Sequence, residues 1–437
     1  MAPTVEPESE PRRVLHLDNV VQAYAWGSRT AIPRLLGRAP TGAPQAELWV
    51  GAHPRAPSRV LEASDRPLDQ VIAADPSALL GPRVAARFGG LPFLLKYLAA
   101  AEPLSVQCHP DPIQAQAGFQ REQAAGLPLD HEARSYRDAN PKPELLVARG
   151  RFEALEGFRE PQEILQNLRG LGAPELTPLL DTLAAEGLAP FYRRLMGSEA
   201  AARATWAQAA AGAARALPSR DPALTWVLDL AERYPDDVGI LAPLVLNLVV
   251  LARDEALYLG AGRLHAYLRG EGVEIMASSD NVVRGGLTSK HVDVQELLRI
   301  VDFTPHPPDV RRPVAERPGL LCYRTPAEHF TLALVRPAGA EARLPADDGP
   351  RVLLGLQGEL RFSFERAPDL TLASGQGVLL LPAAGAFVAS GEGEAAMAAV
   401  PSHALTERTP WLPDRCIRHP RWSSASHPTL PSWRKGA

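Results

Sequence analysis

Short apolar runs separated by glycine and proline dominate the chain from residue 14 to about residue 150. Residues 47–51 (ELWVG) and 91–96 (LPFLLK) are two examples. Runs of this length between turn residues are typical of β-strands joined by turns. This segment is therefore predicted to form strands rather than long helices.

The pattern changes near Gly157, and from residue 161 onward apolar residues recur with helical spacing. The spacing continues through residues 179–183, the alanine-rich residues 199–217 and residues 225–230. A period of about 3.6 residues is the mark of amphipathic helices, so residues 151–239 are predicted to form a helical insertion. Strand-like runs return at residues 257–259 and 264–268, and helical spacing over residues 294–301 predicts one more buried helix.

Residues 323–400 again show short apolar runs, such as 353–360 and 377–382, between turn residues. Many short, evenly spaced strands favour a β-sandwich or jelly roll. A chain of 437 residues is also too long for one compact core. We expect residues 14–150 and 240–305 to form one domain around the helical insertion. Residues 306–410 would form a C-terminal domain, and residues 411–437, rich in Pro, Ser and Arg, a loosely attached tail.

The charge balance excludes several classes of partner. With 46 Lys and Arg against 50 Asp and Glu, the formal net charge is −4, which lacks the positive excess of a nucleic-acid-binding protein. The longest apolar stretch, residues 239–252, is too short for a bilayer and contains Pro243 and Asn247, so no membrane span is predicted. The first 13 residues contain three glutamates and no apolar segment, which predicts a cytoplasmic protein without a secretory signal.

The three cysteines are Cys108, Cys322 and Cys416, and they are far apart in the sequence. They form neither a CxxC pair nor an even framework of half-cystines. Reduced, structural cysteines are predicted, and neither a disulfide scaffold nor a thiolate zinc site is expected.

Residues 104–111 (LSVQCHPD) are the first segment that suggests chemistry. In an extended strand alternate side chains share a face, so Ser105, Gln107 and His109 would point one way while the residues between them pack into the core. Residues 140–144 (NPKPE) place Lys142 and Glu144 two residues apart in a backbone that two prolines restrict. Both segments offer nitrogen or oxygen ligands from a rigid backbone.

A third segment, residues 260–267 (GAGRLHAY), is a glycine turn that leads into a strand where His265 and Tyr267 share a face. Two histidines, one carboxylate and one carboxamide make a mixed nitrogen and oxygen set, which suits zinc or a related divalent ion and leaves a position open for water or substrate. Each fragment alone is more often an ordinary packing pair or turn, so the hypothesis depends on their combination.

The polar residues 274–291 include Arg284 before two glycines and Lys290 six residues later. Glycines permit close backbone approach, and two cations in one loop could bind a phosphate. The alternative is a solvated surface loop in which Asp280 and Asn281 form turns.

Six segments together resemble, in order, the signatures of type I mannose-6-phosphate isomerases, which belong to the cupin superfamily. They are residues 24–28 (YAWGS), 46–51 (AELWVG), 104–111, 141–144 (PKPE), 264–268 (LHAYL) and 279–288 (SDNVVRGGLT). The resemblance extends from about residue 24 to residue 303, and more weakly to the end. Six ordered motifs are far more specific than any one of them.

The resemblance implies a mainly β fold: a cupin-type β-sandwich, or jelly-roll, catalytic domain with an α-helical insertion, followed by a second, C-terminal cupin-like domain. It also implies one Zn²⁺ per chain, and Arg284 as the catalytic arginine. The implied zinc ligands are Gln107, His109, Glu144 and His265. Polar residues that match the substrate pocket of the family are Glu47, Lys96, Ser105, Lys142, Tyr267, Glu274 and Lys290.

Two positions depart from the family pattern. Gly260 stands where the family has a proline, and Ser289 replaces the proline of a Thr-Pro-Lys sequence. Neither change removes a ligand or a charge. Residues 382–388 keep a cupin-like turn without a histidine, so no second metal is expected and the C-terminal domain is predicted to be structural.

The implied reaction interconverts mannose 6-phosphate and fructose 6-phosphate through an enediol. Lys142 and Glu274 are both candidates for the base, and Arg284 could stabilise an oxyanion or hold phosphate. A cupin iron oxygenase and a non-catalytic sugar-binding cupin are the alternatives. A phosphorylated hexose is the predicted partner, and a monomer is expected because no oligomerisation element is recognisable.

Overall fold

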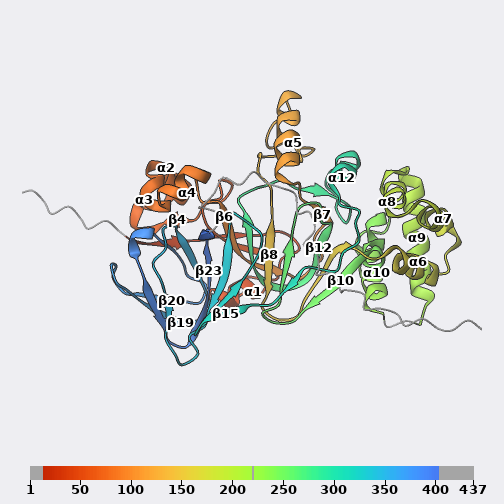
Figure 1. Cartoon of the computed structure of the whole chain (residues 1–437). Helices are drawn as coiled ribbons and strands as arrows, with labels where there is room; N and C mark the ends of the chain where they lie inside the picture. Colours follow the sequence, from red (N-terminus) through yellow and green to blue (C-terminus); the bar gives the residue numbers. More distant parts are fainter. Residues whose placement is uncertain (1–12, 219–220, 403–437) are drawn as a thin grey trace, which may run out of the picture. The chain divides into compact units, whose positions relative to one another are not determined.

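The computed structural model describes residues 13–218 and 221–402. Two large sheets and a set of helices make up this part of the chain (Figure 1), and every strand pair in it is antiparallel. The prediction of a mainly β protein with helices is confirmed. Cys416 and the predicted tail, residues 411–437, lie outside the described residues.

The 11-stranded sheet carries the segments that were singled out for chemistry. Its order is β14 (Val310–Arg311), β11 (Ala256–Leu259), β8 (Glu144–Ala148), β12 (His265–Ala277), β6 (Phe93–Ala100), β3 (Glu47–Val50) and β2 (Val20–Gln22). The first half of β12 also pairs with β7 (Gln107–Cys108) and β9 (Phe152–Phe158). In turn β7 pairs with β13 (Val283–Arg284), and β9 pairs with β10 (Leu246–Leu251).

The 12-stranded sheet combines C-terminal strands with the first strand of the structure. Its order is β15 (Val314–Arg317), β16 (Leu320–Tyr323), β17 (Thr331–Val335), β23 (Gly393–Ala399), β19 (Arg351–Phe364), β21 (Gly377–Leu380), β1 (Val14–Asp18), β4 (Arg59–Val60) and β5 (Arg66–Pro67). Three further strands pair off this path: β18 (Ala342–Leu344), β20 (Leu370–Ala373) and β22 (Phe387–Ser390).

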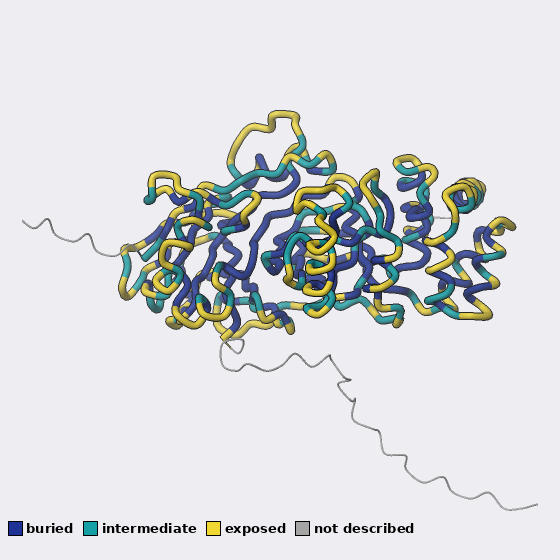
Figure 2. The backbone as a smooth tube through the Cα atoms, turned by 90° about the horizontal axis from the view of Figure 1, so that it is seen from above, coloured by how far each residue is buried: buried dark blue, intermediate teal, exposed yellow. Residues whose placement is uncertain are grey.

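The two faces of β6 show how the two sheets pack against each other and where the single charged residue of the strand lies. Phe93, Leu95 and Tyr97 share a core with residues of the second sheet, while the residues between them face the opposite side. All eight residues of β6 are buried, so the strand reads as a nearly continuous apolar run. Lys96 is the single charge in that run. In Figure 2 the buried parts of the backbone (dark blue) lie in the interior, and the exposed parts lie around them.

The predicted helical segment, residues 151–239, is confirmed from residue 161 onward and continues to residue 245, whereas residues 152–158 form the strand β9. It contains α6 (Pro161–Gly170), α7 (Thr177–Glu186), α8 (Leu188–Gly197), α9 (Ala200–Ala216), α10 (Pro222–Arg233) and α11 (Ala242–Val245). These helices, yellow-green in Figure 1, share one core with Val106, Cys108 and Leu264 beside the strands β7 and β12. The predicted helix of residues 294–301 is α12 (Val294–Ile300), and it joins the same core.

The prediction of strands rather than long helices for residues 14–150 is wrong for one of the five α-helices that this segment contains, the one that is longer than seven residues. This segment contains α1 (Ala31–Leu35), α2 (Leu68–Ala74), α3 (Pro76–Leu80), α4 (Pro82–Phe88) and the 13-residue α5 (Pro112–Ala124). A capping box between Asp111 and Gln114, with Pro112 in the first turn, begins α5. Because α5 projects away from the sheets (Figure 1), it buries little apolar surface and lacks a clear helical periodicity.

Two further sequence predictions concern membranes and cysteines. In the described part of the chain, no helix combines the length and the apolar character that crossing a membrane requires. Cys108 and Cys322 are both free thiols, as predicted. Burial raises the pKa of Cys322 to about 12, which keeps this thiol protonated at neutral pH.

A buried ion network joins the two sheets. Glu394 on β23 accepts hydrogen bonds from Arg149, which follows β8, and from Arg336 and Arg253, with N–O distances of 2.5 Å to 3.0 Å. Asp254 binds Arg149 and Arg336 on the other side. Burial alone would raise the pKa of Glu394, but the hydrogen bonds and charges of Arg149 and Arg336 outweigh it and hold the pKa low.

Glu394→Ala is expected to lower the free energy of unfolding by about 1–3 kcal/mol, because it removes the buried carboxylate of the network and leaves the buried Arg149 with Asp254, 3.4 Å away, as its remaining counter-charge. Urea titrations followed by circular dichroism measure the change. The matched control is Glu341→Ala, which removes the exposed partner of Arg343 and should have little effect. Equal effects of the two substitutions would contradict the role given to this network.

Candidate active site and metal centre

A cavity of about 1060 Å³ opens over the face of the 11-stranded sheet that lies away from the second sheet. Strand β12 contributes to its wall twice, first with His265 and Tyr267 and then with Glu274. Because side chains alternate along a strand, residues 267 and 274 would face opposite sides of a regular strand. A register shift after Tyr267 and the positive φ of Gly270 turn the strand, so both halves face the cavity.

Gly270 is required at this bend for a second reason. A Cβ atom there would lie 2.5 Å from the ring of Phe152 on the paired strand β9. Its φ of +142° is also a conformation that other residues rarely adopt. The local sequence at residue 270 thus sets the concave shape of the site.

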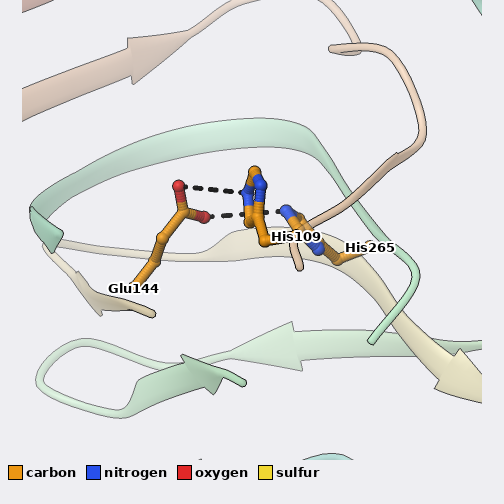
Figure 3. A group of neighbouring side chains, drawn as sticks. All are labelled: His109, Glu144 and His265. Carbon is orange, nitrogen blue, oxygen red and sulfur yellow. Dashed lines mark ion pairs between the residues drawn. The ribbon is translucent and has the colours of Figure 1, made fainter. Parts of the chain in front are cut away.

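Three ligand residues converge in this region (Figure 3). Nε2 of His109 lies 3.3 Å from Oε1 of Glu144, and Nε2 of His265 lies 3.6 Å from Oε2 of the same carboxylate. One ligand atom from each residue lies within 4.8 Å of the others, and all three residues are buried. The structure thus brings together three of the four predicted ligands, which span more than 150 positions of the sequence.

Both imidazoles are oriented by backbone carbonyl groups. Nδ1 of His109 is 2.9 Å from the carbonyl oxygen of Asn281, and Nδ1 of His265 is 3.0 Å from that of Arg263. A carbonyl oxygen only accepts hydrogen bonds, so each Nδ1 must carry the proton. Each Nε2 then has a lone pair that points toward Glu144. An imidazole that is protonated on Nδ1 in this way is the tautomer that binds a metal through Nε2.

The electrostatics of the trio keep the lone pairs free and the carboxylate charged. Burial lowers the pKa of His109 to about 4 and also lowers the pKa of His265, so both rings are neutral at pH 7. Burial would raise the pKa of Glu144, but the charge of Lys142, 3.1 Å away, outweighs burial and holds the pKa well below its usual value.

The strand register places Gln107 beside this trio. Gln107 on β7 pairs with His265 on β12 on one side and with Arg284 on β13 on the other. Its side-chain nitrogen donates to Oγ of Ser105 at 3.4 Å, which leaves the amide oxygen available as a ligand. Both Ser105 and Gln107 line the cavity.

Next to the trio, buried carboxylates and a lysine form a hydrogen-bonded row. Lys96 donates to Oε2 of Glu274 at 2.9 Å and lies 3.5 Å from Oε1 of Glu47. Oε1 of Glu274 accepts from the hydroxyl of Tyr267 at 2.8 Å, and Oε2 of Glu47 accepts from Nε1 of Trp49 at 2.7 Å. The register of β6 and β12, which pairs Lys96 with Glu274, places both on the cavity face.

Burial raises the pKa of Glu274 above its ordinary value, although the ammonium of Lys96 opposes the shift. For Lys96 itself, burial would lower the pKa, but the carboxylates of Glu274 and Glu47 outweigh burial and raise it. Lys96 and Glu274 therefore form a charged pair. The carboxylate of Glu274 has a higher proton affinity than an ordinary glutamate.

The structure brings the predicted site residues together. Eleven of the twelve line the cavity: Glu47, Lys96, Ser105, Gln107, Lys142, Glu144, His265, Tyr267, Glu274, Arg284 and Lys290. His109, the twelfth, is fully buried behind the wall and reaches the cavity through its contact with Glu144. The strand β7 spans only Gln107–Cys108, shorter than the strand predicted for residues 104–111, but the alternation holds because Val106 and Cys108 pack into the core.

Sequence reasoning missed several residues that shape the site. Asn281, considered only as a turn residue, is fully buried, and its Oδ1 accepts the backbone N–H groups of Arg137 and Asp138. Arg55 lines the cavity and pairs with Asp280 at 3.1 Å. Arg137 also lines it. The polar run of residues 278–281 could have drawn attention to Asn281. No feature of the sequence distinguishes Arg55 or Arg137 from the other arginines of the chain.

The trio fits a zinc ion. Nε2 of His109 is buried and makes no hydrogen bond, which is costly for a polar atom unless a ligand takes it up. Ligand atoms around tetrahedral zinc, at about 2.0–2.1 Å from the ion, lie roughly 3.3 Å from one another. The distance between His109 and Glu144 matches this spacing, and two imidazoles with one carboxylate form a donor set typical of catalytic zinc.

Comparison with known proteins gives consistent matches. The family model "Phosphomannose isomerase type I, catalytic domain" matches residues 14–161. The mannose-6-phosphate isomerase of Escherichia coli K12 is 39% identical over 386 residues, which cover 86% of this chain and 95% of that protein. The human mannose-6-phosphate isomerase is 35% identical over 386 residues, covering 79% of this chain and 88% of the human protein.

Solved structures agree with the sequence matches. A zinc-bound mannose 6-phosphate isomerase superimposes with a TM-score of 0.81 at 35% identity, covering 88% of this chain and 99% of that one. The apo form of the enzyme from Salmonella typhimurium gives a TM-score of 0.80 at 35% identity, with 89% and 99% covered. With matches of this identity over most of both chains, the protein belongs to the type I mannose-6-phosphate isomerase, or phosphomannose isomerase, family.

Proposed function

We propose that this protein is a zinc-dependent aldose–ketose isomerase that interconverts mannose 6-phosphate and fructose 6-phosphate. The observation that carries the proposal is the buried trio of His109, Glu144 and His265 at the wall of a large cavity, in a chain whose relatives are named mannose-6-phosphate isomerases. The cavity also contains a buried carboxylate and several cations, which an isomerase acting on a sugar phosphate requires.

One zinc ion per chain would be held by His109, Glu144 and His265, with Gln107 as the fourth ligand. The support for Gln107 is its register opposite His265 and its free amide oxygen. When bound, the zinc would polarise the carbonyl and hydroxyl oxygens of the sugar and lower the energy of the charged transition state. The neighbouring groups of this chain perform the remaining steps.

Glu274 is proposed as the base that moves the proton between C2 and C1 through the enediol. Its raised pKa brings its proton affinity closer to neutral pH, where a general base is most effective. Lys96 and Tyr267 each bond one of its oxygens, which fixes the carboxylate and leaves lone pairs for the substrate proton. Lys142, the other candidate, is paired with the ligand Glu144 and is proposed to keep that carboxylate charged.

The other cavity residues are proposed to bind the sugar. Arg284 lies beside Gln107 in the strand register, where its guanidinium can stabilise the oxyanion that develops at C1 or C2. Ser105, Glu47 and Tyr267 offer hydrogen bonds to hydroxyl groups, and Lys290 offers a charge to the phosphate.

The finer description of the fold is also a proposal. Antiparallel sheets that pack face to face, and the likeness to phosphomannose isomerase structures, support a cupin-type catalytic domain in residues 14–150 and 240–305. The helices α6–α10 support a helical insertion in residues 151–239. Residues 306–410 would form the C-terminal cupin-like domain, without a metal. A monomer in the cytoplasm stays a prediction from the sequence.

The two alternatives have less support. The relatives are isomerases by name, and a related structure contains zinc, which does not favour an iron oxygenase. A non-catalytic sugar-binding cupin would not need the buried carboxylate Glu274 with its raised pKa.

His265→Ala should abolish isomerase activity and bound zinc together, because it removes one ligand of the buried trio. Arg284→Ala should keep zinc and lose turnover by about a hundredfold or more, as expected for a group that stabilises transition-state charge. Elemental analysis and a coupled isomerase assay give both quantities. Full activity in either variant, or loss of zinc from Arg284→Ala, would refute the assignment of these residues.

The rate of the wild-type enzyme should fall as the pH decreases through the raised pKa of Glu274, because the protonated carboxyl cannot accept a proton. Lys96→Met should shift this acid limb to higher pH, since the ammonium of Lys96 lowers the pKa of Glu274. The dependence of kcat on pH measures the shift, with the zinc content determined at each pH as the control. An acid limb at the same pH in both proteins would exclude Glu274 as the base.

A further inference from the structure

The cations of the cavity fall into two groups. Lys96 and Lys142 are paired with the carboxylates Glu274 and Glu144, and Arg55 is paired with Asp280. Arg137, Arg284 and Lys290 also line the cavity, yet none of the three has an ion pair with another described residue. The cavity wall thus holds three cations that have no ion pair within residues 13–218 and 221–402, and the only lining carboxylates that also lack an ion pair there are the exposed Glu132 and Asp130.

These three cations act on one another. Burial is the largest cause that lowers the pKa of Arg284, and the charge of Arg137 lowers it further. Burial also lowers the pKa of Lys290, and the charges of Arg284 and Arg137 add to the effect. Like charges that are held near one another raise the free energy of the empty site, and an anion bound between them removes that cost.

Arg137 is presented to the cavity by a rigid backbone. Its N–H group donates to Oδ1 of the buried Asn281 at 2.7 Å, and Nδ2 of Asn281 donates to the carbonyl oxygens of Asp138 and Asn140 at 2.9 Å. One buried amide therefore ties the loop of residues 137–140 to the segment that leads into β13 and Arg284. The two arginines keep a fixed relation to each other and to His109, whose Nδ1 is bonded to the carbonyl of Asn281.

We propose that Arg137, together with Lys290, binds the phosphate group of the substrate, and that Arg284 is thereby left for the oxyanion near the zinc ligands. The assignment rests on the proposed function for the identity of the sugar phosphate. Arg284 pairs in register with Gln107, whereas Arg137 comes from the loop between α5 and β8. A guanidinium can bind phosphate oxygens through two parallel N–H groups, and Lys290, which lines the same cavity, adds a point charge.

The test compares zinc-loaded wild type with Arg137→Ala and Arg137→Lys. For Arg137→Ala we expect KM for mannose 6-phosphate to rise roughly ten- to a hundredfold, the range of a lost charge-assisted hydrogen bond. The value of kcat should change little, because the contact is the same in the ground state and the transition state. Arg137→Lys should recover part of the lost affinity, since lysine keeps the positive charge but lacks the two parallel N–H groups of the guanidinium. Arg169→Ala, an exposed arginine of α6, is the control and should match wild type.

Inorganic phosphate gives a second measurement that does not depend on turnover. Calorimetry should show weaker binding of phosphate to Arg137→Ala, by a factor similar to the change in KM, and unchanged zinc content. Equal phosphate affinity in Arg137→Ala and wild type would overturn the inference. So would a fall in kcat with an unchanged KM, because Arg137 would then act on the chemical step. A wild type without isomerase activity would refute the proposed function alone, since phosphate binding still decides the role of Arg137.

Discussion

The buried negative charge of Glu144 is the constraint on which the site depends. A carboxylate that is removed from water needs compensating charge, which Lys142 provides from 3.1 Å and which a cation bound by the trio would increase. The backbone bonds that hold each Nδ1 leave both Nε2 atoms directed at that carboxylate. Metal binding is thus favoured by groups whose orientation is set before the ion arrives.

The sheet architecture explains how a charged site can exist in a strongly apolar region. Strands β6, β8 and β12 use one face to pack against the second sheet, where Leu95, Leu145 and Ile275 form part of a dry core. The other face of the same strands presents charged side chains to the cavity. The core therefore fixes the strand register, and the register in turn fixes the pairing of Lys96 with Glu274.

Much of this arrangement could be predicted from the sequence. The helical segment and the strand segments after residue 256 were predicted, and eleven of the twelve residues proposed for the site line one cavity, because ordered motifs carry information that single residues do not. The helix α5 was missed, since an exposed helix lacks an apolar stripe that would reveal it. Arg137 was also missed, because its importance comes from a bond between two loops more than 140 residues apart, which no local pattern encodes.

The turn in β12 could not be predicted either, although its cause is visible afterwards. Period-two alternation predicts that His265 and Tyr267 share a face, and it would place Glu274 on the opposite one. The register shift after Tyr267 and the bend at Gly270 bring Glu274 to the same face as His265 and Tyr267. Alternation is reliable within a strand segment and fails across a bend, so the place of Glu274 in the pocket followed from resemblance rather than from pattern.

The anchoring of both histidine rings by main-chain carbonyl groups has an evolutionary consequence. The side chain at residue 263 can be exchanged without removing the carbonyl oxygen that orients His265, provided that the chain follows the same path. Insertions or deletions in the loops that contain residues 263 and 281 would displace the oxygens whatever the new side chains are. Selection for metal affinity should therefore act on the length of the two loops more strictly than on the side chain at residue 263.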